Sequence, residues 1–328
     1  ERQVPWSLVL KVLEARKGES PESSHYWKRE VELYLSRWLE SLPGPLVAPR
    51  CFGVEEFADE GCWLWLEHVV DDVEDPWPLA HYGVVANHLG QFSGANAIPT
   101  ASPSWPWLSS KFIRDDVEHA AANIDRMRRY SSHPLVHRVL PGNSRDDLFQ
   151  LFDQRETLLG SLEKLPQVLC HFDAFRSNLF GQRNQDGLVS TVAIDWAFVG
   201  SGPIGAEIVA LVLVALVAGQ VEWSRAWELD TVFLPATWRD YVRPAGAAIQ
   251  CRFAWPIQPR LPCDGLAYMV TYRLLTIYNS PREMKSMTLI SSNSWTVWPG
   301  LDCLPRIWHA RLWHWFMRLV SLKTIDPA

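Results

Sequence analysis

Polar residues interrupt a series of short apolar runs in the middle of the chain. The segment "VLCHFDAFRSNLF", residues 168–180, places His171, Asp173 and Asn178 between two such runs, and Asp195 ends a third run, "STVAID". Short apolar runs bounded by polar turns are typical of β-strands. Because adjacent strands bring their ends together, we expect these polar residues to share one site.

The residue types in this set favour phosphoryl transfer. An amide and a carboxylate supply the hard oxygen ligands that Mg²⁺ prefers. A further carboxylate can orient a hydroxyl group and accept its proton. A single Asp or Asn is common in turns for purely local reasons. A metal-dependent hydrolase with His171, Asp173 and Asp195 as ligands is an alternative, although such sites usually contain more His and carboxylate ligands.

Two segments carry a resemblance to a known family. "HFDAFRSN" resembles the catalytic loop of the aminoglycoside phosphotransferase/choline kinase family, whose members are relatives of protein kinases, and "AIDWAFVGSGPIGAEI" resembles the metal-binding segment of that family. The resemblance implies that Asp173 is the catalytic base and that His171 braces the loop. It also implies that Asn178 and Asp195 hold Mg²⁺.

A lysine near the start of the chain fits the same family pattern. Lys11 lies inside the apolar run "LVLKVL", where an ammonium group is costly to bury without a partner. In the helix predicted over residues 19–44, Glu30 lies on the flank of the apolar stripe, whereas Glu32 points further away. We therefore expect Glu30 to pair with Lys11, and the resemblance implies that this lysine contacts the phosphates of ATP. A strand lysine that extends its ammonium into solvent is the alternative.

The first seventy residues have the order strand, helix, strand, strand. A strand is predicted over 6–15, the helix begins near Ser20 and Pro21, and a hairpin joins strands over 49–57 and 61–69. "LWLEHV" resembles the connector between the two lobes of a kinase, so the backbone near Glu67 and Val69 would hold adenine.

The predicted fold class is therefore α+β and bilobal, like that of protein kinases. Residues 1–70 would form a small β-rich lobe that binds the nucleotide. Residues 71–328 would form a large, mostly helical lobe with the catalytic loop, the metal site and the substrate-binding helices.

Composition narrows the possible partners and the compartment. The net charge is −6, and no basic run stands out, which argues against a nucleic-acid partner. The apolar run at 208–219 is too short to cross a bilayer and predicts a buried helix. The six cysteines form no C-x-x-C pair, which is typical of reduced thiols in a cytoplasmic protein.

The predicted function is a small-molecule phosphotransferase with ATP and Mg²⁺ as cofactors and a small hydroxylated substrate. The family normally opens with two strands and a Gly-rich or Ser-rich loop that covers the phosphates. Only ten residues precede Lys11, and Gly18 is the sole glycine before Gly44. The small lobe is thus expected to lack its first strands. A nucleotide-binding pseudokinase, or an inactive truncated kinase-like binding module, is the alternative function.

Overall fold

The computed structural model describes residues 6–226, with gaps at 59, 98–104, 140–143, 184–186 and 188, together with residues 228, 229 and 232. The substrate-binding helices predicted towards the C-terminus lie largely outside these residues. The described chain divides into two compact units, the first with residues up to 112 and 165–215, the second with residues 113–164 and 216–227. The boundary predicted at residue 70, between a nucleotide-binding lobe and a catalytic lobe, stays a prediction.

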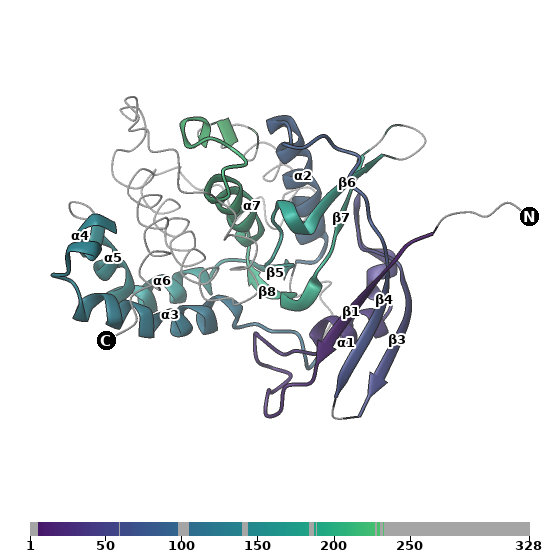
Figure 1. Ribbon diagram of the computed structural model, residues 1–328, viewed down its shortest axis with the longest axis horizontal. Coiled ribbons are helices and arrows are strands. Elements are labelled where there is room, and N and C mark those ends of the chain that lie inside the picture. Colours follow the sequence, from purple (N-terminus) through teal and green to yellow (C-terminus); the bar gives the residue numbers. More distant parts are fainter. Residues whose placement is uncertain are drawn as a thin grey trace, which may run out of the picture. The chain divides into compact units, whose positions relative to one another are not determined.

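The N-terminal sheet of the first unit has three antiparallel strands. These are β1 (Leu8–Glu14), β4 (Gly61–Glu67) and β3 (Cys51–Phe57), in the order β1-β4-β3 (Figure 1). The predicted strand and the predicted hairpin are thus confirmed. In the β1–β4 register Lys11 lies opposite Leu64, which is fully buried. Because side chains alternate along a strand, Lys11 shares its face with the buried side chains of Leu13 and Leu66.

The helix that follows is much shorter than predicted. The prediction of a helix over 19–44 was wrong, because α1 spans only Arg29–Leu35. Serine side chains preceding it bond the local backbone: Ser20 Oγ accepts from the Glu22 amide and Ser23 Oγ from the His25 amide, each at 3.3 Å. Such bonds compete with helix formation.

The guanidinium of Arg29 also engages the backbone before α1. It donates to the carbonyl oxygens of Ser23 and Ser24, the latter at 2.6 Å, and also to the Trp107 and Ala197 carbonyl oxygens. This side chain is completely buried. The helical period places Leu35 in the predicted apolar stripe, and this was wrong, because Leu35 is 48% exposed.

Two smaller sheets follow in the first unit. One has the order β2-β7-β6, with β7 parallel to β2 and antiparallel to β6. The other pairs β5 with β8 in antiparallel fashion. The bounds of these strands are β2 (Leu46–Val47), β5 (Gln167–Cys170), β6 (Leu179–Arg183), β7 (Val189–Ala193) and β8 (Gly200–Pro203).

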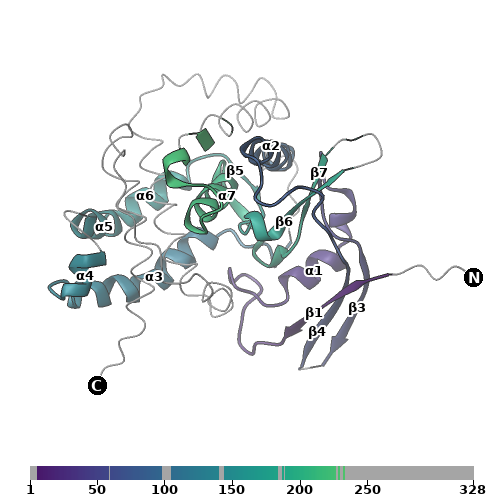
Figure 2. The same ribbon diagram turned by 45° about the horizontal axis from the view of Figure 1, so that its top comes forward.

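Helices cover these sheets. α2 (Leu79–Ala95) contacts β2, β5 and β7 (Figure 2). α7 (Ala206–Val217) confirms the buried helix predicted from the apolar run at 208–219. In the part of the chain that the structure describes, no helix combines the length and the apolar character needed to cross a membrane.

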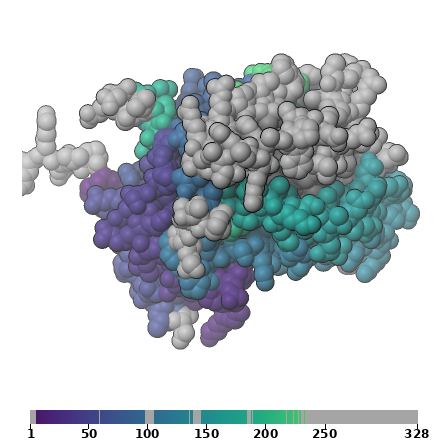
Figure 3. All heavy atoms as spheres, turned by 180° about the vertical axis from the view of Figure 1, so that it is seen from behind, coloured from purple at the N-terminus to yellow at the C-terminus, as the bar shows by residue number. Residues whose placement is uncertain are grey.

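The second unit is helical. α3 (Phe112–Arg129) is followed by α4 (Pro134–Val139). The segment 145–165 forms two helices, α5 (Ser144–Asp153) and α6 (Arg155–Leu162). Arg114 on α3 pairs with Glu156 at 2.8 Å and with Glu163 at 2.7 Å, which fastens α3 to the α6 segment. In the space-filling view of Figure 3 the N-terminal part of the chain, coloured purple, gathers in one region of the surface.

Candidate active site

Asp173 and Asn178 form one hydrogen-bonded unit in the loop after β5. The Asn178 side-chain amide donates to the Asp173 carbonyl oxygen at 3.0 Å and to Asp173 Oδ2 at 2.8 Å. Both residues are buried, and a backbone bond from the Asn178 amide to the Phe175 carbonyl, at 2.8 Å, closes the turn between them. The Asn178 nitrogen is therefore committed to Asp173, which leaves its Oδ1 as the atom that could bind a metal.

His171 connects this loop with the segment that leads to Asp195. Its Nδ1 accepts from the Asp173 amide at 3.2 Å, and its Nε2 donates to the Ile194 carbonyl oxygen at 3.0 Å. The ring is fully buried and lies 4.5 Å from the Trp196 ring. These bonds require a neutral imidazole with its proton on Nε2. The histidine therefore links the backbone of the loop to that of Ile194, and the bracing role that the resemblance implies for it stays a prediction.

The pairing of β6 with β7 brings Asn178 and Asp195 to the same end of two strands. Leu179 lies opposite Ala193, and the Ile194 amide donates to the Asn178 carbonyl oxygen at 2.9 Å. The expectation that adjacent strands bring these two residues together is confirmed. Asp195 has φ 60° and ψ 64°, a left-handed conformation that Asp tolerates better than most residues.

Lys11 joins β1 and α1 to Asp195. Its ammonium donates to Glu30 Oε2 and, at 2.7 Å, to Asp195 Oδ1. The contact predicted between Lys11 and Glu30 is therefore present, whereas the bond to Asp195 was not predicted. Glu32 points elsewhere, as expected, and lies 3.6 Å from Lys28.

The carboxyl group of Glu30 is completely buried. Its Oε1 accepts from the Trp196 amide at 3.2 Å, which ties α1 to the residue after Asp195. Burial raises the pKa of Glu30, and the Lys11 ammonium opposes this shift. Burial acts to lower the pKa of Lys11, but Glu30 and Asp195 together raise it above its ordinary value. The lysine is consequently a fixed positive charge at any physiological pH.

Phe172 and Glu207 fix the start of the loop through a backbone hydrogen bond and ring packing. The Phe172 amide donates to Glu207 Oε1 at 3.1 Å, and Glu207 lies buried in the first turn of α7. Phe172 has φ 63°, and its ring stacks on Phe112 at 4.4 Å. A Cβ atom added to Gly202 would lie 2.4 Å from the Phe172 ring, so only glycine leaves room for it. Sequence reasoning gave Glu207 no part in the site, and its only signal is a carboxylate at the start of an apolar helix.

The predicted connector residues Glu67 and Val69 lie at the end of β4 and just beyond it. Glu67 ends β4, its side chain is exposed, and its Oε2 accepts from the Arg50 amide at 3.1 Å. Val69 is partly exposed. Among the residues that the structure describes, no hydrogen bond or ion pair joins either side chain to Lys11, Asp173 or Asp195. A role of this backbone in binding adenine stays a prediction.

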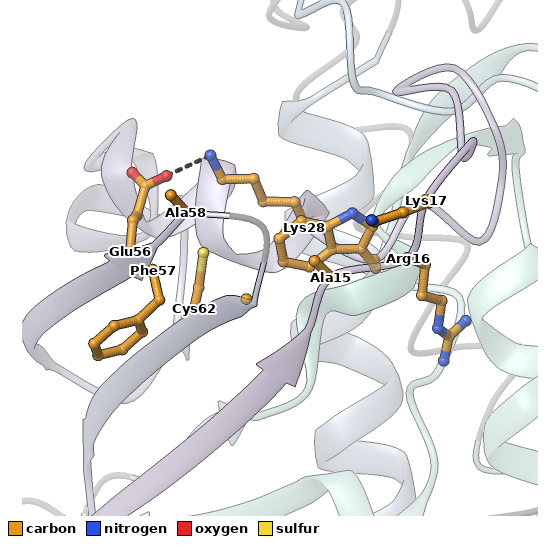
Figure 4. A pocket seen from close by; sticks show the side chains of 10 residues that line it. Ala15, Arg16, Lys17, Lys28, Glu56, Phe57, Ala58 and Cys62 are labelled. Atoms are coloured by element: carbon orange, nitrogen blue, oxygen red, sulfur yellow. Dashed lines mark hydrogen bonds and ion pairs between the residues drawn. The ribbon is translucent and has the colours of Figure 1, made fainter.

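A cavity of about 320 Å³ lies at the other end of the N-terminal sheet. It is lined by residues 15–17 after β1, by Trp27 and Lys28 before α1, and by the tip of the β3–β4 hairpin (Figure 4). Lys28 and Glu56 pair across it at 2.6 Å. None of the predicted site residues lines this cavity, so we do not place the active site there.

Comparisons with known proteins support the fold through structure alone. No family model matches the sequence, and no curated protein matches it either. Among solved structures, "Amicoumacin kinase hAmiN in complex with AMP-PNP, Ca2+ and Ami" is 12% identical, has a TM-score of 0.52 and covers 97% of this chain and 82% of that chain. The GDP complex of wild-type aminoglycoside 2'-phosphotransferase-IIIa is 12% identical, has a TM-score of 0.50 and covers 85% of this chain and 90% of that chain. The α+β, bilobal, protein-kinase-like fold class is thereby confirmed.

Proposed function

We propose that this protein transfers the γ-phosphoryl group of Mg²⁺-bound ATP to a hydroxyl group of a small molecule. The observation that carries the proposal is the pairing of Lys11 with both Glu30 and Asp195. Ile194 connects this cluster to the Asp173–Asn178 unit through its backbone. Phosphoryl transfer requires a phosphate-binding cation, metal ligands and a residue that orients the nucleophile, and little else from the protein.

In this proposal Asp173 orients the acceptor hydroxyl and takes its proton. The acceptor oxygen then forms a bond to the γ-phosphorus while the bond between that phosphorus and the β–γ bridging oxygen breaks, which releases ADP. Asn178 donates to the Asp173 carboxylate and His171 accepts from the Asp173 amide, so that together they hold this residue in place. Lys11 would contact the nucleotide phosphates, and Glu30 would keep the ammonium oriented.

The residues present fit a magnesium ion. Asn178 Oδ1 and the Asp195 carboxylate are hard oxygen donors, the ligand type that Mg²⁺ takes. The side chain of Asp195 is 40% exposed, so a hydrated ion can reach it. Bound there, the ion would neutralise charge on the phosphate oxygens.

The structural neighbours support the binding of a nucleotide, a divalent metal and a small substrate. One was solved with AMP-PNP and Ca²⁺ and the other with GDP. Their names specify phosphorylation of amicoumacin and of an aminoglycoside, so we propose a small hydroxylated acceptor of this general kind. We further propose that ATP is the donor, that the backbone between Glu67 and Val69 receives its adenine, and that the protein acts in the cytoplasm.

A calorimetric titration with ATP tests the nucleotide and metal sites first. Binding should require Mg²⁺, disappear on addition of EDTA and weaken at least about tenfold in Asp195→Ala, because the variant lacks one of two protein ligands. Asp125→Ala, which removes an exposed carboxylate on α3, is the matched control and should bind like the unmodified chain. Equal binding with and without Mg²⁺ would refute the metal assignment.

A nucleotide-binding protein without transfer activity is the second candidate. It is favoured by the direct bond between Lys11 and Asp195, since this contact occupies both the proposed phosphate ligand and the proposed metal ligand. The two candidates differ in turnover. Release of ADP over several turnovers in the presence of amino sugars or other hydroxylated acceptors establishes the transferase, whereas tight binding of ATP without turnover supports the second candidate.

A further inference from the structure

We propose that Asp71 is a positioning residue for the 171–178 loop: its carboxylate holds the chain on both sides of Asn178. This inference rests on the proposed function, because it concerns the residues assigned there to the acceptor and the metal. Asp71 lies two residues after Val69, beyond the end of β4, and is distant in sequence from the loop.

One oxygen of the Asp71 carboxylate faces each side of Asn178. Oδ2 lies 2.8 Å from Nη2 of Arg176, the first residue of the 3₁₀ turn Arg176–Asn178. Oδ1 accepts from the Gly181 amide, in β6, at 2.9 Å. The side chains of Asp71 and Arg176 are only 13% and 14% exposed. Asn178 thus lies between two residues, Arg176 and Gly181, that bind the same carboxylate.

The same carboxylate is fixed by its own segment. Oδ1 also accepts from the Val73 amide at 3.1 Å, and Oδ2 also accepts from Trp77 Nε1 at 3.0 Å. The Arg176 guanidinium lies 4.3 Å from the centre of the Trp77 ring, and Trp77 is buried. A cation over an indole face adds to the ion pair. Asp71, Trp77 and Arg176 therefore form a rigid anchor, which we call the Asp71 anchor.

The Asp71 anchor acts on Asp173 through Asn178. Arg176 and Asn178 belong to the same single turn, and the Asn178 amide group holds the Asp173 carbonyl and carboxylate. A shift of this turn therefore moves both the proposed base and the proposed metal ligand. Since the anchor begins just after the proposed adenine-binding backbone, it also couples the position of that backbone to the loop.

The four donors explain why a carboxylate is needed at position 71. A carboxylate accepts at both oxygens, whereas the amide of Asn accepts at one atom and donates at the other. Asp71→Asn would therefore turn an NH₂ group towards two donors, either the Gly181 and Val73 amides or the Arg176 and Trp77 side chains. The neighbouring Asp72 is exposed, and among the residues that the structure describes its carboxylate accepts from a single donor, the Arg183 amide, at 3.0 Å. Asp72→Asn keeps that acceptor and is the matched control.

Steady-state kinetics of the full chain with ATP and an amino sugar as acceptor form the first test. Asp71→Asn should lower kcat by about 10- to 100-fold, with a smaller change in the KM for ATP, because a displaced base slows the chemical step while Lys11 and Asp195 are unchanged. Asp72→Asn should stay within about twofold of the unmodified chain. Arg176→Gln should match Asp71→Asn, and the double variant should be no slower than the slower single variant, because both changes break one unit. Arg176→Lys should recover part of the loss.

Hydrogen exchange of the loop amides gives a readout that does not need turnover. In Asp71→Asn the Phe175 and Asn178 amides, which close the loop turn, should exchange at least about tenfold faster, whereas Asp72→Asn should leave them unchanged. If the unmodified chain transfers no phosphoryl group, the proposed function fails, and loop exchange still decides the role of Asp71. Unchanged exchange and kcat in Asp71→Asn, or a loss of kcat fully accounted for by unfolded protein, would overturn the inference.

Discussion

Asn178 donates from one side-chain nitrogen to both the backbone carbonyl and the carboxylate of Asp173. The residue proposed to hold the metal and the residue proposed to take the proton are thus parts of one hydrogen-bonded unit. The side-chain nitrogen cannot turn away without breaking both of these buried hydrogen bonds, at a cost of about 0.5–3 kcal/mol for each. The orientation of the Asn178 oxygen is therefore set by Asp173, and a change at either residue should affect the other.

The first prediction concerns the proposed base. Asp173→Asn retains the shape of the side chain but cannot accept the proton of a hydroxyl group, so kcat should fall by about 10²- to 10⁴-fold. Mg²⁺-dependent binding of ATP, measured by calorimetry, should persist because Asp195 and Lys11 are intact. Asp125→Asn on α3 serves as a control that removes an exposed carboxylate outside the site. Phosphoryl transfer at the unmodified rate in Asp173→Asn would exclude this residue as the base.

The second prediction compares two glutamates on the same helix. Glu30→Gln leaves the Lys11 ammonium without its buried counter-charge and should lower the free energy of unfolding by about 3 kcal/mol. Glu32→Gln alters a partly exposed ion pair with Lys28. This variant should change the free energy of unfolding by less than about 0.5 kcal/mol. Chemical denaturation monitored by Trp fluorescence measures both values. Equal losses of stability in the two variants would mean that the buried Glu30 carboxylate stabilises the protein no more than the partly exposed Glu32 carboxylate does.

The third prediction concerns the space behind Phe172. A Cβ atom at Gly202 would lie 2.4 Å from the Phe172 ring, so Gly202→Ala should destabilise the protein by about 1–3 kcal/mol through overpacking and should slow transfer. Gly160→Ala is the opposite case, because nothing lies within 4 Å of the added atom on α6. That variant should gain about 0.5–1 kcal/mol of stability from the removal of a helical glycine. Thermal unfolding and kcat distinguish the two, and a stable, fully active Gly202→Ala would contradict the packing argument.

The fourth prediction concerns pH. His88 is buried on α2, its Nδ1 lies 2.8 Å from Thr191 Oγ1, and burial followed by repulsion from His81 lowers its pKa to about 4. The unfolded chain binds a proton at this residue near its ordinary pKa of about 6.5, so between these values the unfolded state takes up more protons. The stability that neutral His88 contributes is complete above about pH 6.5 and should be lost as the pH falls towards 4, at up to about 1.4 kcal/mol per pH unit.

His88→Gln isolates this contribution, since glutamine can still bond Thr191 but does not titrate. Denaturant unfolding between pH 7 and pH 4 should show a steeper loss of stability in the unmodified chain than in the variant. Parallel pH profiles would show that His88 does not titrate on unfolding in this range.

Parts of the fold and the site follow local rules and could be predicted from the sequence. The apolar runs of β1, β3 and β4 have strand character, and the helical period placed Glu30, and not Glu32, towards Lys11. The pairing of β6 with β7 follows from two short strands around a polar turn. It brings Asn178 close to Asp195.

Other features depend on contacts that no local pattern encodes. The helix predicted from residue 19 begins only at Arg29, because the buried guanidinium takes the carbonyl oxygens of Ser23 and Ser24. The bond between Lys11 and Asp195 joins residues far apart in the chain, as does the Asp71 anchor. Spacing and composition do not predict such partners, since these contacts form only when the separate elements pack together.

Ile194 illustrates how much of this arrangement is independent of side-chain identity. Its amide bonds Asn178 and its carbonyl accepts from His171, so its peptide groups carry the connection between the loop and Asp195. Alanine scanning would therefore not detect this contribution, because alanine has the same main-chain N–H and C=O groups. An amide-to-ester replacement that removes the N–H of residue 194, or Ile194→Pro, would break the bond to the Asn178 carbonyl without replacing any ionisable group of the site.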